Sequence, residues 1–267
     1  MDICVAMLML TQFFLLVCSS RSNAAVLVEQ RIWLMDISAH GRYNSSAWSG
    51  NIDLEKDLGI GNAGASQTRV ILELNPSSLI RMDMAAGTFT GSADWTERRW
   101  FMDGLISREF HHHVVEQIDT RIWKLGWINN LKPLKGTKSR IGLLVDLKGY
   151  SADGLARVSS AMGDNLPTTF ARKMHWQTVS PMLGIVLASK PNAKTDYFIE
   201  MSGFAQKGNF SYIDCDATVR FFLDSKKNTG LTLGYRFSQY NNNKQKDRSD
   251  FDRVRLSGFN FGISKKF

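Results

Sequence analysis

The chain has 267 residues and a formal net charge of +8, with 43% hydrophobic and 22% charged residues. This balance is too polar for a bundle of transmembrane helices and too apolar for a disordered chain. The 21 Gly and 5 Pro exclude collagen-like and proline-rich proteins, and the length allows one large domain or two small ones.

Residues 1–24 have the pattern of a secretory signal peptide. Their apolar run, Val5 to Val17, is followed by small residues three and one positions before an expected cut after Ala24. An uncleaved anchor helix is the alternative, but the run is shorter than the about 20 apolar residues that span a bilayer. Cleavage leaves residues 25–267 with Cys215 alone, so we expect no internal disulfide and no thiolate metal site.

The remaining chain alternates apolar and polar residues with a period of two, which is typical of a β-strand with one apolar face. The clearest segment is Ser211 to Leu223. No apolar run of 18 or more residues follows residue 24, which excludes transmembrane helices. Ten strands are expected, near residues 30–43, 68–75, 79–90, 115–130, 138–152, 175–190, 194–206, 209–224, 228–242 and 250–266.

Two all-β architectures fit this alternation. In a soluble sandwich the apolar face points inward, whereas in a membrane barrel it meets lipid and the polar face lines the lumen. Polar faces that are rich in glycine and carry both charge signs favour the barrel, as do strands near the ~9–11 residues that a bilayer requires. We therefore predict an antiparallel transmembrane β-barrel of about ten strands in the cell outer membrane. Twelve strands are the alternative, if Gly50 to Leu58 forms a strand.

Short and long connections alternate along the chain, as periplasmic turns and external loops do in such barrels. Asp224 to Asn228 is expected to be a short turn. Trp48 to Gln67, Gly91 to His113 and Ala152 to Arg172 are expected to be external loops. An even number of strands places both termini in the periplasm.

The polar faces predict a network of charged side chains in the lumen. On the first strand, Trp33, Met35 and Ile37 are expected to face lipid, opposite Asp36. The near-balance of acids and bases is what a plugged lumen needs. The predicted network comprises Asp36, Glu73, Arg81, Asp83, Asp146, Lys148, Glu200, Asp214, Asp216, Arg220 and Arg236, together with Arg69 and Arg140.

The end of the chain resembles the assembly signal of Gram-negative outer-membrane β-barrels. The residues that carry the resemblance alternate back from the terminus: Phe259, Phe261, Ile263 and Phe267. Ile52 to Gly59 and Gly234 to Phe237 are similar to segments of an uncharacterised group of these barrels. The resemblance implies an outer-membrane location and assembly by the outer-membrane insertion machinery, and it implies no chemistry.

Two clusters could carry chemistry. In a strand, His111 and His113 could share a transition metal, but no further ligands complete a site, so we expect an exposed edge and neither metal nor cofactor. Asp214 and Asp216 share one face, as an acid–base pair would. Arg220 and Arg236 on the same phase favour a structural network instead, because ion-pair networks also perturb carboxylates.

Aromatic and basic residues suggest what the barrel contacts. Trp123 and Trp127 are expected at the periplasmic membrane interface, with a sugar-stacking platform as the alternative. Basic residues near the external rim would suit the phosphates of lipopolysaccharide. These basic residues are Arg98, Arg99, Arg108, Arg172, Lys173, Lys244, Lys246, Arg248, Arg253 and Arg255.

The sequence favours a barrel without catalysis, serving envelope structure or the narrow, gated passage of small solutes. The alternatives are a rim enzyme, acting as a protease or on lipid A, and a surface that binds ligands as an adhesin does. Expected partners are the lipid bilayer, lipopolysaccharide and the insertion machinery. No nucleic acid is expected, because no module for it is recognisable, and the oligomeric state stays open.

Overall fold

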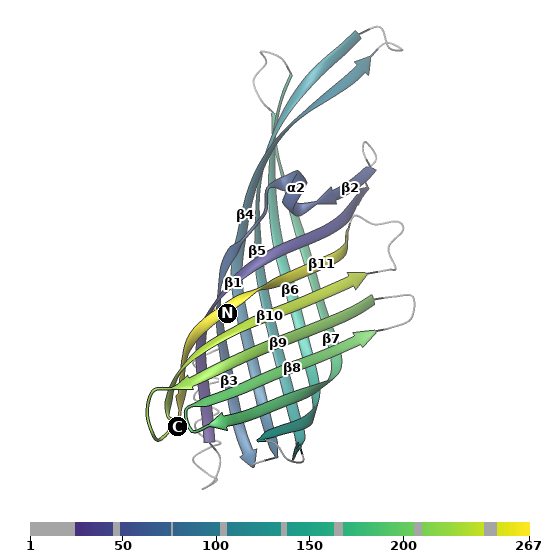
Figure 1. Cartoon of the computed structure of the whole chain (residues 1–267). Helices are drawn as coiled ribbons and strands as arrows, with labels where there is room; N and C mark the ends of the chain where they lie inside the picture. The colour runs from purple at the N-terminus through teal and green to yellow at the C-terminus, as the bar shows by residue number, and fades with distance from the viewer. Residues whose placement is uncertain are drawn as a thin grey trace.

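The described part of the chain folds into a closed antiparallel β-barrel with strongly tilted strands (Figure 1). The computed structural model describes residues 25–44, 49–75, 77–101, 106–134, 138–162, 168–205, 210–242 and 250–267. The predicted signal peptide, residues 1–24, lies outside this description. The elements are β1 (Ala25–Asn44), β2 (Ser49–Asp53), α2 (Leu54–Leu58), β3 (Ala63–Asn75), β4 (Ser78–Phe101), β5 (Ile106–Pro133), β6 (Ser139–Met162), β7 (Thr168–Asn192), β8 (Thr195–Ala205), β9 (Phe210–Phe222), β10 (Thr229–Asn242) and β11 (Asp250–Lys266).

Ten strands, β1 and β3 to β11, form the wall, which confirms the prediction of a ten-stranded barrel. Consecutive wall strands pair with each other, and β11 pairs back onto β1 from Leu27–Lys266 to Arg42–Asp250 to close the ring. In the described residues, β2 pairs with the end of β1 alone. The twelve-strand alternative is therefore wrong, because the segment Gly50 to Leu58 forms most of β2 and then turns into a helix.

The helix α2 is short and held by a cap at each end. Asp53 accepts hydrogen bonds at 3.1 Å from the backbone N–H groups of Glu55 and Lys56, which satisfies donors that a helix start leaves free. Gly59 ends the helix with φ +62°, and a Cβ there would lie 2.6 Å from the carbonyl oxygen of Ser92 in β4. Glycine at this position therefore lets α2 pack against the upper part of the wall. The helix that the structure describes is not long and apolar enough to cross a membrane.

Four wall strands are much longer than a bilayer requires. Strands β4, β5, β6 and β7 have 24, 28, 24 and 25 residues, and they rise above the other strands at the upper end of the barrel (Figure 1). Cross-strand pairing continues to Phe101–Ile106 and to Ser160–Thr168. The expectation of long external loops at Gly91 to His113 and Ala152 to Arg172 is therefore wrong, because paired strands occupy most of both segments.

The outer face of the wall is apolar, as predicted for most strands. Leu143 is 60% exposed, Leu183 71% and Leu233 52%, which fits a face that meets lipid. Trp127, 48% exposed, also lies on this face and donates from Nε1 to Ser78 Oγ at 3.0 Å, beside the lower turns. Trp123 covers Gly149 of the next strand, where a Cβ would lie 2.1 Å from the indole ring.

Strand β1 has the opposite phase to the predicted one. Trp33, Met35 and Ile37 are buried inside the barrel at 0–2% exposure, whereas Ile32 and Leu34 are 50% and 54% exposed on the outer face. The physical reason is that the inward face of β1 changes along its length, from charged near the chain start to apolar further up. Asp36 is exposed on the outer face, so the prediction that it belongs to the lumen network is wrong.

Candidate functional site: the filled lumen and its lower mouth

The middle of the barrel contains a network of buried ion pairs. Arg69 lies between two carboxylates: its Nε is 2.6 Å from Asp83 Oδ1, and its Nη2 contacts Asp216. Arg81 likewise lies 3.2 Å from Asp83, and it also contacts Glu200. These side chains come from β3, β4, β8 and β9, so the network ties the wall together across the lumen.

Two lysines form the second part of this network. Lys124 Nζ is 2.9 Å from Asp146, 3.0 Å from Asp214 and 3.4 Å from Glu200. Lys148 Nζ is 2.6 Å from Asp214 Oδ1 and donates to Ser238 Oγ at 2.7 Å. Both lysines are about 1% exposed. Burying such charges is tolerable because each is paired and hydrogen-bonded.

A third group of charges lies nearer the lower end of the barrel. Glu29 contacts both Arg31 and Arg220, and Arg31 Nη1 donates to Thr218 Oγ1 at 3.2 Å. Arg31 also lies 3.8 Å from Asp216. This contact joins the group to the central network.

The structure brings most of the predicted lumen residues together. Nine of them are buried in one network: Arg69, Arg81, Asp83, Asp146, Lys148, Glu200, Asp214, Asp216 and Arg236. Arg220 lies at its lower border, and Glu73 lies at the lower mouth, where it pairs with Lys266 at 2.6 Å. Sequence reasoning missed Glu29, Arg31 and Lys124. Extending the alternation of β5 through Lys124, between Trp123 and Leu125, would have placed this lysine on the inward face. Glu29 and Arg31 share the parity of Trp33, which is expected from the sequence to face lipid, so their charges are the sequence signal against that phase of β1.

The predicted acid–base pair is enclosed by cations. Asp214 contacts Lys124 and Lys148, with Arg236 Nε at 3.6 Å. Asp216 contacts Arg69 and accepts a hydrogen bond from Thr218 at 2.8 Å. The two carboxylates are 1% and 2% exposed. This arrangement suits a structural network, because each carboxylate is already satisfied and shielded from solvent.

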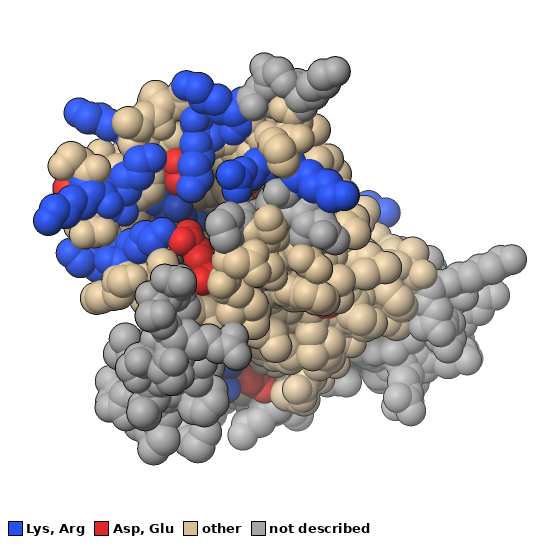
Figure 2. Space-filling model, turned by 90° about the horizontal axis from the view of Figure 1, so that it is seen from below, with Lys and Arg blue, Asp and Glu red and all other residues tan. Residues whose placement is uncertain are grey.

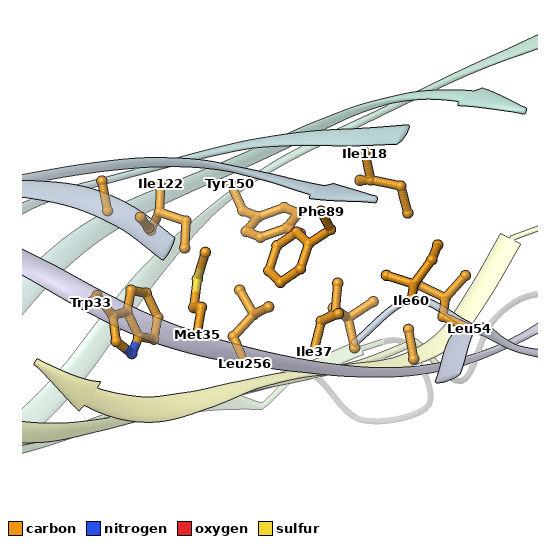
Figure 3. Packing of buried hydrophobic residues seen from close by; sticks show 14 residues of the cluster. Trp33, Met35, Ile37, Leu54, Ile60, Phe89, Ile118, Ile122, Tyr150 and Leu256 are labelled. Atoms are coloured by element: carbon orange, nitrogen blue, oxygen red, sulfur yellow. The ribbon is translucent and has the colours of Figure 1, made fainter. Parts of the chain in front are cut away.

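An apolar cluster fills the upper lumen above the ion pairs. Figure 3 shows Trp33, Met35 and Leu256 pointing toward Ile122 and Tyr150 from the opposite wall. Higher in the barrel, α2 and the residue that follows its cap add Leu54 and Ile60, and β4 and β5 add Phe89 and Ile118. We call the network of ion pairs the ionic layer and this cluster the apolar layer. The two layers meet where the Arg236 guanidinium lies 5.2 Å from the centroid of the Trp33 ring. The lumen is thus filled at two successive levels of different chemistry.

Histidine–aspartate pairs lie on the outer side of the tall strands. His113 Nδ1 is 2.6 Å from Asp94 Oδ1, and His175 Nδ1 is 2.6 Å from Asp153 Oδ1. All four side chains are at least half exposed. The side chains of His111 and His112 lie outside the described residues. Across the part of the chain that the structure describes, no group of three or more His, Cys, Asp or Glu is placed to hold a metal ion.

The lower mouth opens into a cavity of about 420 Å³, which we call the cup. Seen from below, Lys and Arg gather over one part of this end of the molecule (Figure 2). Arg140, Lys190 and Arg220 line the cup together with Glu73 and Asp196. This end carries the C-terminus and the short turns, which are periplasmic in barrels with an even number of strands.

Comparison with known proteins shows the fold without assigning a family. No family model matches the chain, and no curated protein matches it. Among solved structures, the outer membrane protease OmpT from Escherichia coli is similar with a TM-score of 0.53 at 10% identity, over 91% of this chain and 97% of that one. The translocator domain of the autotransporter NalP from Neisseria meningitidis matches with a TM-score of 0.34 at 8% identity, over 99% and 97%.

The likeness to OmpT shows the outer-membrane β-barrel fold. The location predicted from the sequence, the cell outer membrane, agrees with this fold and with the apolar outer face. The surroundings of the wall are therefore membrane lipid.

Proposed function

We propose that this protein is a closed, non-catalytic barrel that serves envelope structure or passes small solutes only by a narrow, gated route. The observation that carries the proposal is the filling of the lumen by an ionic layer and an apolar layer in series. Eight-stranded barrels are just filled by their side chains, whereas 16–18 strands leave an aqueous channel. Ten strands with arginine, lysine and tryptophan directed inward leave no wide water-filled path.

The proposal predicts low conductance in a planar lipid bilayer. Large, stable, non-selective conductance of the unchanged protein would contradict it. A variant that removes one buried pair, Asp214→Ala with Lys148→Ala, is expected to raise conductance because it deletes two side chains from the ionic layer. The matched control, Asp153→Ala with His175→Ala, removes a pair from the outer surface and is expected to leave conductance unchanged.

A rim enzyme is the second candidate, and the exposed His175–Asp153 pair is the observation that favours it. A histidine held by a carboxylate is the usual form of a general base, and this pair lies on the tall strands. The control is His40→Ala on β1, because His40 Nδ1 also lies beside a carboxylate, 3.0 Å from Asp53 Oδ2. Hydrolysis of a peptide or of lipid A by the purified protein, abolished by His175→Ala and retained by His40→Ala, would replace our proposal by this one.

We also propose lipopolysaccharide and the insertion machinery as partners. Arg253 and Arg255 are exposed on the upper part of β11, where guanidinium groups would suit phosphates. Phe259, Phe261, Ile263 and Phe267 are 45–66% exposed along the outer face of the last strand. A row of exposed apolar side chains at the chain end is a surface that an insertion machine could bind before lipid covers it.

A further inference from the structure

The cup at the lower mouth has two kinds of wall. Its apolar side is formed by Leu27, Ile71, Leu79 and Phe198 from β1, β3, β4 and β8. Its polar side is formed by basic residues from β1, β3, β6, β7 and β9: Arg31, Arg69, Arg140, Lys190 and Arg220. A volume of about 420 Å³ lies in the range of small-molecule sites.

The mouth of the cup carries an excess of positive charge. The lining contains two carboxylates, Glu73 and Asp196, against five basic residues. Three of these bases, Arg31, Arg69 and Arg220, are already paired with buried carboxylates, so the excess comes from Arg140, Lys190 and the lysines of the turns. Glu73 is already paired with Lys266 at 2.6 Å, and Asp196 lies 3.9 Å from Lys190. The turns at this end of the barrel add three exposed lysines: Lys138, Lys194 and Lys226. The local field therefore attracts anions from the periplasmic side.

The basic residues of the cup lie at two depths. Arg31, Arg69 and Arg220 form its roof, and the carboxylates of the ion network hold their guanidinium groups in place. Arg140 and Lys190 lie nearer the opening and are exposed. A ligand would therefore first meet Arg140 and Lys190 at the mouth and then, further in, guanidinium groups that carboxylates hold in place. Guanidinium groups match the paired oxygens of a phosphate or a carboxylate.

We propose that the cup binds an organic anion, a phosphate or carboxylate group carried on an apolar body. The oxyanion would contact Arg140 and Lys190, and the apolar body would lie against Ile71, Leu79 and Phe198. Such a ligand could be a soluble periplasmic compound or the headgroup region of an anionic phospholipid, because both present the same chemistry. The proposal does not depend on whether the lumen conducts.

The test is calorimetric titration of the mature protein in a nonionic detergent. Phenyl phosphate is the soluble probe, with inorganic phosphate and benzyl alcohol as its charged and apolar halves. Mixed micelles with dimyristoyl phosphatidylglycerol, compared with the phosphatidylcholine of the same chain length, form the lipid arm. The cup variant is Arg140→Gln with Lys190→Gln. The control, Lys194→Gln with Lys226→Gln, removes the same charge from the same rim outside the cup.

We expect phenyl phosphate to bind more tightly than either of its halves. The cup variant removes both cationic contacts, and because the loss of one charge-assisted hydrogen bond weakens binding about tenfold, we expect at least this reduction, while the control variant stays near the unchanged protein. Saturable binding of phosphatidylglycerol alone, lost in the cup variant, would identify a lipid as the source and still support the site. Equal weakening in both variants, or no saturable binding in either arm, would overturn the proposal. Heat-dependent gel mobility of each variant shows that it is folded.

Discussion

Replacing Asp214 by Asn tests the ionic layer, because two lysines and Arg236 lie beside this carboxylate and depend on it to different extents. Lys124 keeps Asp146 at 2.9 Å and Glu200 at 3.4 Å after the change. Lys148 loses the negative charge of its partner at 2.6 Å and keeps neutral acceptors such as the Ser238 hydroxyl at 2.7 Å. Removing one partner of a buried pair leaves an uncompensated charge, which costs about 3–5 kcal/mol. We therefore expect the free energy of unfolding of Asp214→Asn to fall by about this amount.

A second substitution separates the unpaired charge from general damage to packing. Asp214→Asn with Lys148→Met removes both charges, so no ammonium group is left at this place without its carboxylate. The double variant should therefore recover most of the lost stability. The measurement is urea unfolding of the refolded barrel in lipid vesicles, followed by tryptophan fluorescence. Asp153→Asn, which removes an exposed carboxylate, serves as the control and should change little.

Either of two results would refute this reasoning. An unchanged unfolding free energy for Asp214→Asn would mean that water or a shifted side chain already compensates Lys148. A double variant less stable than Asp214→Asn would mean that Lys148 contributes through its packing, for example against the Tyr212 ring, whose centroid is 4.5 Å from Nζ.

Three further predictions concern the outer face, the chain end and a lower turn. Leu233→Arg places a charge on the lipid face and should lower the unfolding free energy by about 2–4 kcal/mol if the residue lies near the bilayer midplane; an effect near zero in the same vesicle assay would place it outside the membrane. Deleting Phe267 should lower the yield of heat-modifiable barrel in cells without changing the unfolding curve of the inserted fraction. An undiminished yield would show that the insertion machinery does not recognise this residue. The backbone N–H groups of Thr229 and Asn228 donate to Asp224 and hold the pKa of its carboxyl below the ordinary value. The lowered pKa contributes stability that is present above the unfolded-state pKa of about 3.9 and is lost as the pH falls through the folded-state pKa. Hydrogen exchange of this turn should therefore speed up in acid. Asp224→Asn should remove that acid dependence.

The sequence predicts strands better than it predicts their faces. On β6, β9 and β10 one face is apolar over the middle of the strand, from Ile141 to Leu147, from Ile213 to Phe221 and from Leu231 to Phe237, so composition alone shows which side meets lipid. On β1 the face that starts with Glu29 and Arg31 continues with Trp33 and Met35. An apolar run there is equally compatible with lipid and with a filled lumen. The period of two shows that the two faces of the strand alternate. Which face points into the lumen depends on the side chains that the opposite wall places there.

The tall strands escape prediction for a related reason. Above the membrane there is no lipid to require an apolar outer face, so the alternation fades while the backbone pairing continues. The sequence predicts a loop at Gly91 to His113 because both faces of this segment carry polar residues. Hydrogen bonds between neighbouring strands hold it extended. Local composition does not contain this information.

The partners within the lumen network also lie beyond the sequence. Arg69 and Asp216 are separated by 147 residues and meet across the barrel. Their contact depends on the stagger of the strands, which is a property of closure with a given number and tilt. The sequence could thus supply most members of the network, but it could not supply their pairing.

The order of the layers along the barrel axis limits how this protein could open. A solute entering the cup from below first meets guanidinium groups that Glu29 and Asp216 already hold, so an anion would compete with internal carboxylates to go further. Beyond them lies the apolar layer around Phe89, where a charged solute would lose its hydration without gaining a partner. Passage therefore needs two separate changes, one electrostatic and one of packing. Because α2 contributes Leu54 to the apolar layer, displacement of α2 would open that layer without disturbing the ion pairs.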